Sequence, residues 1–252
     1  MAARLTALLL LALLLGACSA QVKQLEPVVV NRYPHDPAAF TQGLLMSEGR
    51  VFESTGIYGA SSMREVHLES GRVLRRVNLD DRYFGEGLEL VGNRLIMLTW
   101  REGEALVFDA ETFSHVETFT YDGEGWGLCY DGTELVMSDG SDELTFRDPE
   151  TFEELRRVSV SVHGEPIRNI NELECVEGNV YANVWLTREI IRIDPETGAV
   201  NAVIDASVLL TEAQWAALTP DATLNGIAWR EERGTFLLTG KLWPWMFEVR
   251  FE

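Results

Sequence analysis

The sequence has little cysteine, little histidine and few basic residues. It contains three cysteines and four histidines in 252 residues, and 21 lysines and arginines against 40 acidic residues, so its formal net charge is −19. The histidines are scattered without a second metal ligand at close spacing, which argues against a catalytic zinc site. The acidic balance argues against nucleic acid as a partner, because no basic patch is available to meet phosphates.

The sequence also lacks an apolar run long enough to cross a bilayer. Residues 5–15 form an apolar run of eleven residues after a short basic start, which is too short for a membrane span and typical of a secretory signal. The run ends in "LLGAC", which resembles the bacterial lipobox, where the cysteine, here Cys18, is lipidated and becomes the mature N-terminus. An ordinary signal with a chance cysteine is the alternative.

We therefore expect a lipoprotein signal over residues 1–17 and a tether over residues 18–26. The mature protein is expected to be exported and held at the membrane by its lipid, on the periplasmic or outer-membrane side. Cys129 and Cys175 remain in the mature chain. An exported compartment permits a disulfide, but two cysteines do not make a disulfide framework, and we interpret both as buried strand residues.

Five segments of the chain share one layout, in which a strand, a turn rich in Gly, Asp, Asn or Glu, and a second strand follow one another. This is the chemistry of a β-hairpin. The copies begin at residues 42, 86, 126, 171 and 225, so their spacings are 44, 40, 45 and 54. A further turn element, such as "IDPETGAV" from Ile193, follows each of the first four hairpins. Four strands per unit of about 40–45 residues is typical of a β-propeller blade.

The repeats predict an all-β, five-bladed β-propeller over residues 27–252. The long last spacing is explained by residues 209–221, where Thr211 and Gln214 form a capping box and Pro220 ends a short helix. This helix is expected as an insertion between the fourth and fifth repeats. A β-sandwich also has short strands at regular spacing, but nearly identical hairpins at a nearly constant period favour the propeller.

The first strand of each propeller blade lines the central channel, so equivalent residues of the repeats converge on one axis. The residues that open the five copies are Gln42, Glu86, Trp126, Asn171 and Asn225. The residues that end their second strands are Gly56, Trp100, Gly140, Trp185 and Lys241. A constant Gly-Leu framework that carries varied polar and aromatic side chains is the organisation of a pocket.

Ordinary roles are the alternative for each of these residues. The tryptophans would then be core residues, the asparagines turn or cap residues, and Lys241 a solvated lysine or the partner of Glu86 in a structural ion pair. As a site, Glu86 would be partly desolvated, which raises the pKa of a carboxylate and suits it to acid–base work. Lys241 and the carboxamides could stabilise an oxyanion. No Ser-His or Cys-His arrangement is visible, so we expect a proton shuttle without a covalent intermediate, on a small amine or amide.

A series of motifs extends over almost the whole chain after the signal. It includes "FTQGL" (residues 40–44), "FGEGLEL" (84–90), "LTW" (98–100), "GEGWGL" (123–128), "INELE" (170–174), "ANVW" (182–185) and "TGKLWP" (239–244). In this series the chain resembles the plant and bacterial type of glutaminyl-peptide cyclotransferase. The resemblance implies a five-bladed propeller that cyclises N-terminal glutaminyl residues to pyroglutamate with release of ammonia, without a metal or other cofactor.

The resemblance also implies roles for individual residues. Glu86 looks like the catalytic acid and base, with Lys241 and Asn171 binding the γ-carboxamide. The remaining pocket residues are Phe40, Gln42, Phe84, Trp100, Trp126 and Trp185. We expect a monomer whose partners are peptides or proteins with N-terminal glutamine. The alternative is a non-enzymatic propeller lipoprotein that binds peptides or glycans through the same pocket, since a fold does not decide function.

Overall fold

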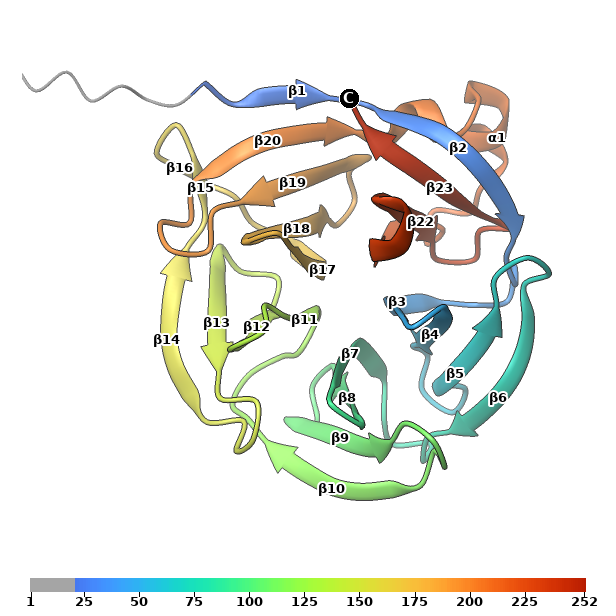
Figure 1. The fold of residues 1–252 in the computed structure, drawn as a ribbon, viewed down its shortest axis with the longest axis vertical. Helices are drawn as coiled ribbons and strands as arrows, with labels where there is room; N and C mark the ends of the chain where they lie inside the picture. Colours follow the sequence, from blue (N-terminus) through green and yellow to red (C-terminus); the bar gives the residue numbers. More distant parts are fainter. Residues whose placement is uncertain (1–20) are drawn as a thin grey trace, which may run out of the picture.

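Five mainly antiparallel sheets stand in a ring around a central axis in the computed structural model, which describes residues 21–252 (Figure 1). The five-bladed propeller is confirmed, and the β-sandwich is wrong. Residues 1–20, which include the expected signal and Cys18, lie outside the described residues. The helices within residues 21–252 are too short and too polar to span a membrane.

The blades follow the chain in order, and each begins with its innermost strand. Blade 1 contains β3 (Thr41–Ser47), β4 (Arg50–Thr55), β5 (Ser62–His67) and β6 (Arg72–Asn78). Blade 2 contains β7 (Gly85–Val91), β8 (Arg94–Thr99), β9 (Glu104–Asp109) and β10 (His115–Thr120). Blade 3 contains β11 (Leu128–Tyr130), β12 (Leu135–Ser138), β13 (Glu143–Arg147) and β14 (Glu154–Ser159).

The last two blades carry the additions to the repeat. Blade 4 contains β17 (Ile170–Val176), β18 (Asn179–Val184), β19 (Glu189–Ile193) and β20 (Val200–Asp205), and blade 5 contains β21 (Leu224–Arg230), β22 (Thr235–Gly240) and β23 (Trp245–Phe251).

A small hairpin of β15 (Ser161–Val162) and β16 (Glu165–Pro166) precedes blade 4. The expected helical insertion is present as η1 (Ala206–Leu209) and α1 (Glu212–Ala217), and Thr211 and Gln214 form the predicted capping box. A 3₁₀ turn, η2 (Glu231–Arg233), forms part of the blade 5 hairpin turn.

The hairpin turns explain why the repeats fold locally. Glu48 and Gly49 join β3 to β4 with φ values of 50° and 77°, and Glu177 and Gly178 join β17 to β18 with 49° and 73°. A two-residue turn with positive φ at both positions has the twist that antiparallel strands need, and glycine adopts it without steric cost.

The N-terminus closes the ring. Strand β2 (Pro27–Pro34) pairs antiparallel with β23 from the C-terminus, with Pro27 opposite Phe251 and Pro34 opposite Trp245, and so supplies the outermost strand of blade 5. Strand β1 (Lys23–Leu25) pairs in parallel with β20 on the edge of blade 4. Residues 23–25 therefore belong to the sheet structure, although they lie in the segment expected to be a tether.

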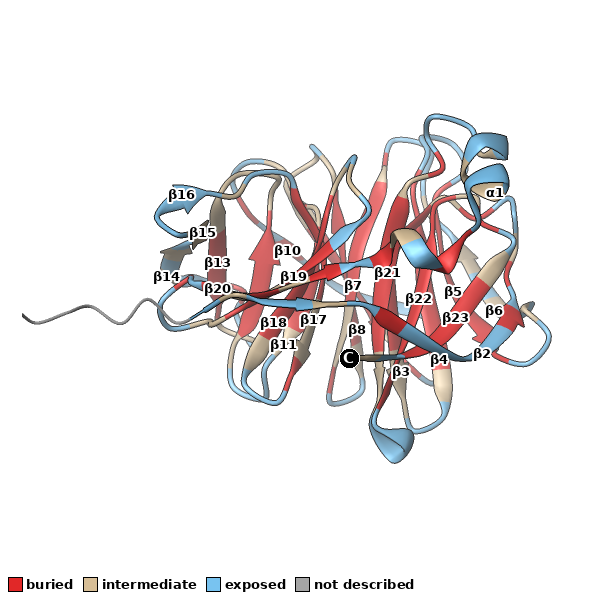
Figure 2. Ribbon diagram, turned by 90° about the horizontal axis from the view of Figure 1, so that it is seen from above, coloured by how far each residue is buried: buried red, intermediate tan, exposed pale blue. Residues whose placement is uncertain are grey.

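The core lies between the blades. Each of the five apolar clusters takes its side chains from two neighbouring blades; Phe52 and Met63 of blade 1, for example, pack with Leu95 and Met97 of blade 2. Strand β4 is buried along almost its whole length, whereas β6 alternates between exposed and half-buried residues. Figure 2 shows the same gradient, with buried inner strands and exposed outer ones. A strand that is buried on both faces of its sheet has a nearly continuous run of apolar residues in its sequence, which explains the repeated hydrophobic hairpins.

Carboxylates inside the channel accept hydrogen bonds from backbone N–H groups of the innermost strands. Glu172 accepts from Leu44 N at 3.2 Å and from Ile227 N at 2.8 Å, so it joins blade 4 to blades 1 and 5. Glu174 accepts from Trp229 N at 3.1 Å. Such N–H groups need a partner when they are buried. Burial raises the pKa of Glu172 and of Glu174 well above the usual carboxylate value.

A disulfide also connects two inner strands. Cys129 on β11 and Cys175 on β17 are bonded, with an S–S distance of 2.01 Å and Cα atoms 5.5 Å apart. Both cysteines lie on strands as expected, but only Cys129 is fully buried, and the disulfide that the sequence left open is present. The two positions are 46 residues apart, which is close to one repeat, so they face each other on adjacent blades. A loop of this length corresponds to about 4 kcal/mol of stabilisation in the chain-entropy description.

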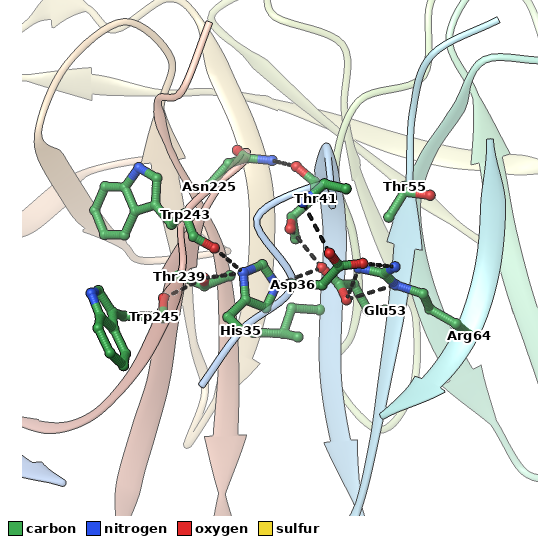
Figure 3. Close-up of polar contacts among 12 residues, drawn as sticks. His35, Asp36, Thr41, Glu53, Thr55, Arg64, Asn225, Thr239, Trp243 and Trp245 are labelled. Atoms are coloured by element: carbon green, nitrogen blue, oxygen red, sulfur yellow. Dashed lines mark hydrogen bonds and ion pairs between the residues drawn. The ribbon is translucent and has the colours of Figure 1, made fainter. Parts of the chain in front are cut away.

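A buried polar cluster, the closure cluster, joins blade 5 to blade 1 behind the channel (Figure 3). Glu53 is its centre: it accepts hydrogen bonds from Thr41 Oγ1 at 2.6 Å and Arg64 Nε at 2.9 Å, and it pairs with His35 Nε2 at 2.9 Å. The other ring nitrogen of His35 lies 2.6 Å from the carbonyl oxygen of Trp243 in blade 5. The cluster therefore connects the end of β2, blade 1 and the last hairpin of the chain.

The closure cluster contributes most to the free energy of unfolding from pH 4.5 to pH 6.5. Burial acts to raise the pKa of Glu53, but the charges of His35 and Arg64 outweigh it and lower that pKa to about 2. Burial acts to lower the pKa of His35, and the Glu53 carboxylate outweighs it and raises that pKa above 6.5. The Glu53 contribution is present above pH 4.5 and is lost as the pH falls towards 2. The His35 contribution is present below pH 6.5 and is lost as the pH rises through its raised pKa.

We expect Glu53→Ala to lower the free energy of unfolding by about 3–5 kcal/mol, because His35 would stay buried without its counter-charge and Arg64 would keep only its pair with Asp36. For a chain of this size, that corresponds to a fall in Tm of roughly 6–20 °C at pH 5.5. Thermal unfolding followed by circular dichroism measures it. The control is Glu111→Ala, which removes an exposed partner of Arg50 and is expected to change stability by no more than about 0.5 kcal/mol. A Tm within 2 °C of the parent for Glu53→Ala would contradict the role of the cluster.

Candidate active site

One cavity of about 350 Å³ lies where the innermost strands of the blades converge. All nine predicted site residues line it, and every blade contributes at least one of them. They are Phe40, Gln42, Phe84, Glu86, Trp100, Trp126, Asn171, Trp185 and Lys241. Asn225, which opens the fifth hairpin, does not line the cavity but lies directly behind Gln42.

Bulges in the inner strands place the polar side chains in the cavity. The register of β3 shifts between Thr41 and Gly43, at Gln42, and β7 and β17 shift at Glu86 and Asn171. A bulge leaves an extra residue unpaired and re-aims its side chain. Gly87 follows Glu86 because a Cβ there would lie 2.6 Å from the backbone nitrogen of Leu128 in the next blade. Gly87 is therefore set by the close approach of two blades.

Glu86 is buried, with 5% of its surface exposed. Its Oε1 accepts a hydrogen bond from Gln42 Nε2 at 3.0 Å, and Asn225 holds Gln42 by donating to its Oε1 at 3.4 Å and to Thr41 O at 3.0 Å. Burial raises the pKa of Glu86 well above the usual carboxylate value; Lys241 opposes the shift, and Glu124 and Glu102 add to it. A raised pKa makes a carboxyl better suited both to accepting and to donating a proton during a reaction.

Lys241 is the cation of the cavity. It is buried, and its Nζ lies 4.9 Å from the centre of the Phe40 ring. Burial lowers its pKa, while Glu86 and Asp221 oppose the shift. Within residues 21–252, no side-chain ion pair shorter than 4.0 Å joins Lys241 to Glu86, so the two share the cavity without forming the structural ion pair considered from the sequence.

Two polar atoms at the cavity are buried without a hydrogen-bond partner in the described chain. They are Asn171 Oδ1 and Thr223 Oγ1, and both residues line the cavity. Buried polar atoms in native structures nearly always have partners, so an unpaired acceptor that borders a cavity is available to a bound ligand or to water. Asn171 is one of the predicted site residues, whereas Thr223 was not predicted, because it lies in the loop before β21 and outside the repeat pattern.

Aromatic rings form the wall of the cavity. Phe84 packs edge-on against Phe40 at 6.2 Å and against Trp100 at 5.4 Å, and Trp126 packs edge-on against Trp185 at 5.5 Å. The three tryptophans are half-buried, so they are wall residues and not core residues. At the repeat positions equivalent to Trp100 and Trp185, blades 1 and 3 have glycine, which leaves room for the neighbouring rings. A Cβ at Gly56 would lie 2.2 Å from the Phe84 ring, and a Cβ at Gly140 would lie 2.7 Å from Trp126.

Glu124 holds two of these indoles, and the sequence analysis gave it no role. It accepts hydrogen bonds from Trp100 Nε1 at 2.7 Å and from Trp126 Nε1 at 3.0 Å. Arg101 pairs with the same carboxylate at 3.0 Å and lies 3.6 Å from the centre of the Trp100 ring. Two indole N–H groups beside an apolar pocket need an acceptor, and that requirement is the signal in "GEGWGL" that could have identified Glu124.

The mouth of the cavity contains further residues that the sequence did not indicate. Ile57 follows β4, Leu186 follows β18, and Pro220 and Asp221 follow helix α1. Within residues 21–252, no group of three or more histidine, cysteine, aspartate or glutamate side chains has an arrangement suited to a metal ion.

Comparison with known proteins gives consistent matches over the whole propeller. A model of the family described as glutamine cyclotransferase matches residues 4–251. Glutaminyl-peptide cyclotransferase from Arabidopsis thaliana is 39% identical over 236 residues, which are 93% of this chain and 73% of the plant protein. The crystal structure of Myxococcus xanthus glutaminyl cyclase is 42% identical, with a TM-score of 0.86, and the match covers 92% of this chain and 99% of that one.

A more distant structure shows the fold alone. The WD40 repeats of RRP9 are 11% identical, with a TM-score of 0.52 and coverage of 89% of this chain and 100% of that chain. The family model and the two close relatives extend over the same five repeats that form the cavity, and they confirm the resemblance seen in the motifs. This chain therefore belongs to the glutamine cyclotransferase family.

Proposed function

We propose that this protein cyclises N-terminal glutaminyl residues of peptides and proteins to pyroglutamate, with release of ammonia, by general acid–base catalysis in the central cavity and without a catalytic metal. Membership of the family supports the overall reaction. One observation carries the mechanism: Glu86 is buried at the cavity with a raised pKa and a single side-chain hydrogen bond within residues 21–252, from Gln42.

The reaction needs one proton to move from one nitrogen to another. The neutral α-amine attacks the γ-carboxamide carbon, and a new N–C bond closes the five-membered ring. The attacking nitrogen loses a proton to the Glu86 carboxylate. Glu86 then gives this proton to the carboxamide nitrogen, the old C–N bond breaks, and ammonia leaves. The carboxylate is restored at the end, and no covalent intermediate with the protein is required.

The other groups of the cavity match the charges that develop. The carboxamide oxygen becomes an oxyanion during the attack, and the buried ammonium of Lys241 stabilises it in a site with little water. The unpaired Oδ1 of Asn171 accepts an N–H of the carboxamide and orients it. The rings of Phe84, Trp100 and Trp126 exclude water and hold the side chain flat against the acid. The family membership and this arrangement together favour an enzyme over the alternative of a binding propeller.

We also propose that the protein is an exported lipoprotein, anchored to the membrane through Cys18 and active as a monomer. The "LLGAC" motif supports the anchor. A signal cleaved before Cys18 would leave only four residues, 19–22, between the lipid and strand β1.

Glu86→Gln is expected to lower kcat by at least about 100-fold, because an amide cannot relay the proton. The assay measures ammonia released from a dipeptide that begins with glutamine. In the parent protein, kcat should decline with falling pH at a pH above 4.5, since Glu86 loses its carboxylate form as the pH drops through its raised pKa. Glu117→Gln on the exposed edge of β10 is the matched control and should retain full turnover. Near-normal turnover of a folded Glu86→Gln variant would remove Glu86 from the mechanism.

Chelators are expected to leave the rate unchanged. Incubation with EDTA or 1,10-phenanthroline before the ammonia assay tests this, with a zinc-loaded zinc enzyme, which the chelator should inactivate, as the positive control. Inhibition that added zinc reverses would show that the reaction depends on a metal. Binding of the dipeptide without any ammonia, with or without chelator, would instead support the non-enzymatic propeller.

Cys18→Ser is expected to move the protein expressed in a bacterium from the membrane fraction to the soluble fraction, with turnover retained. Detergent phase partition and intact mass of the parent protein measure the anchor, since each acyl chain adds a defined mass and partitions into the detergent. A parent protein that stays in the aqueous phase with an unmodified cysteine would contradict the anchor.

A further inference from the structure

Two large aliphatic side chains project into solvent at the mouth of the cavity. Ile57 from blade 1 is 43% exposed and Leu186 from blade 4 is 63% exposed, and both line the cavity, together with Pro220 from the insertion before blade 5. Among the described residues that line the cavity, these three are the aliphatic ones, and they come from three separate segments of the chain. We refer to Ile57, Leu186 and Pro220 as the lip.

The backbone at two lip residues is unfavourable for the side chains that it carries. Ile57 has a φ of 98° and Leu186 a φ of 68°. Positive φ is unusual for any residue with a Cβ and is an outlier for a β-branched one. Local hydrogen bonds maintain the two turns: Ala60 N and Ser61 Oγ donate to Ile57 O, both at 2.9 Å, and Thr187 Oγ1 donates to Val184 O at 2.7 Å.

Folding does not explain these side chains. Ile57 and Leu186 occupy equivalent places, each two residues after the last residue of the second strand of its blade, Thr55 and Val184. Glycine would adopt the same φ without strain, and a polar side chain would suit the exposure. An exposed aliphatic residue in a strained conformation is destabilising on both counts, and such residues gather at functional sites.

The direction of the bound chain indicates what the lip contacts. In the proposed reaction the glutaminyl residue occupies the inner cavity, where its amine and carboxamide reach Glu86, Lys241 and Asn171. The main-chain carbonyl carbon of this residue is bonded to the rest of the peptide, which must therefore extend out of the cavity through its mouth. The side chain of the second residue of the substrate is therefore the first group outside the inner cavity.

We propose that the lip binds the side chain of the residue that follows the N-terminal glutamine, and that the enzyme selects peptides in which this residue is apolar. The inference rests on the proposed function, because it uses the same cavity for the glutaminyl residue. Asp221, exposed at the same mouth, adds repulsion against an acidic second residue. One side chain packed in such a subsite changes kcat/KM by about 10-fold or more.

The test compares dipeptide amides that share an N-terminal glutamine and differ in the second residue: Leu, Phe, Gly and Asp. The parent protein is expected to turn over the Leu and Phe peptides with a kcat/KM about 10-fold above the Gly peptide, and the Asp peptide least well. In the double variant Ile57→Asn, Leu186→Asn, the ratio of Leu to Gly peptide should fall to near one. Asparagine is chosen because it is polar, similar in size to leucine and tolerant of positive φ.

The matched control removes two exposed aliphatic residues far from the cavity. Val116 on β10 and Leu155 on β14 are 56% and 51% exposed on outer strands, and Val116→Asn, Leu155→Asn should leave the ratio at its parent value. Equal kcat/KM for all four peptides in the parent protein would overturn the lip as a subsite, as would an unchanged ratio in the lip variant. In those cases ammonia release from the Gly peptide would still support the proposed function. Absence of ammonia from every peptide would overturn both.

Discussion

Closure of the ring is the constraint on which the rest of the structure depends. Strand β2 completes the sheet that the C-terminal strand β23 leaves open, and the buried Glu53 carboxylate ties His35, Thr41 and Arg64 together behind it. The backbone adds a direct contact, in which Leu242 N donates to Ala39 O at 2.6 Å. These interactions bring Lys241 beside residues 40–42, although about 200 positions separate them in the chain. Without closure, the cation and the acid of the cavity would not face the same space.

Burial has two different outcomes for the carboxylates of the channel. Glu172 uses both of its oxygens to accept backbone N–H groups from neighbouring blades, so it serves as a structural bridge. Glu86 lies on the same kind of inner strand and is also buried, but a bulge turns it towards the cavity and a single carboxamide holds it. The difference in partners, and not in burial, separates a structural acid from one that can exchange a proton with a ligand.

Much of this arrangement could be predicted, because the repeat converts sequence position into spatial position. Residues one period apart face the same axis, so the nine predicted residues line one cavity. The predictions failed or fell short where a feature lies outside the period or depends on a contact between blades. Glu124 acts through the indole N–H groups of two other residues, and Thr223 belongs to a loop. The disulfide joins positions 46 residues apart, which is nearly one period, but its formation stayed open in the sequence because two cysteines alone do not establish a pairing.

The sequence by itself determined the number of blades, the helical insertion and the identity of the converging side chains, since these follow from hairpin chemistry and from a period of about 40–45 residues. Only the tertiary structure decided how the ring closes, which acids become bridges, and which aliphatic residues remain exposed at the mouth. The physical reason is that burial and hydrogen-bond partners at the channel are set by contacts between blades. Such contacts join residues from separate repeats, and no local pattern in the sequence records them.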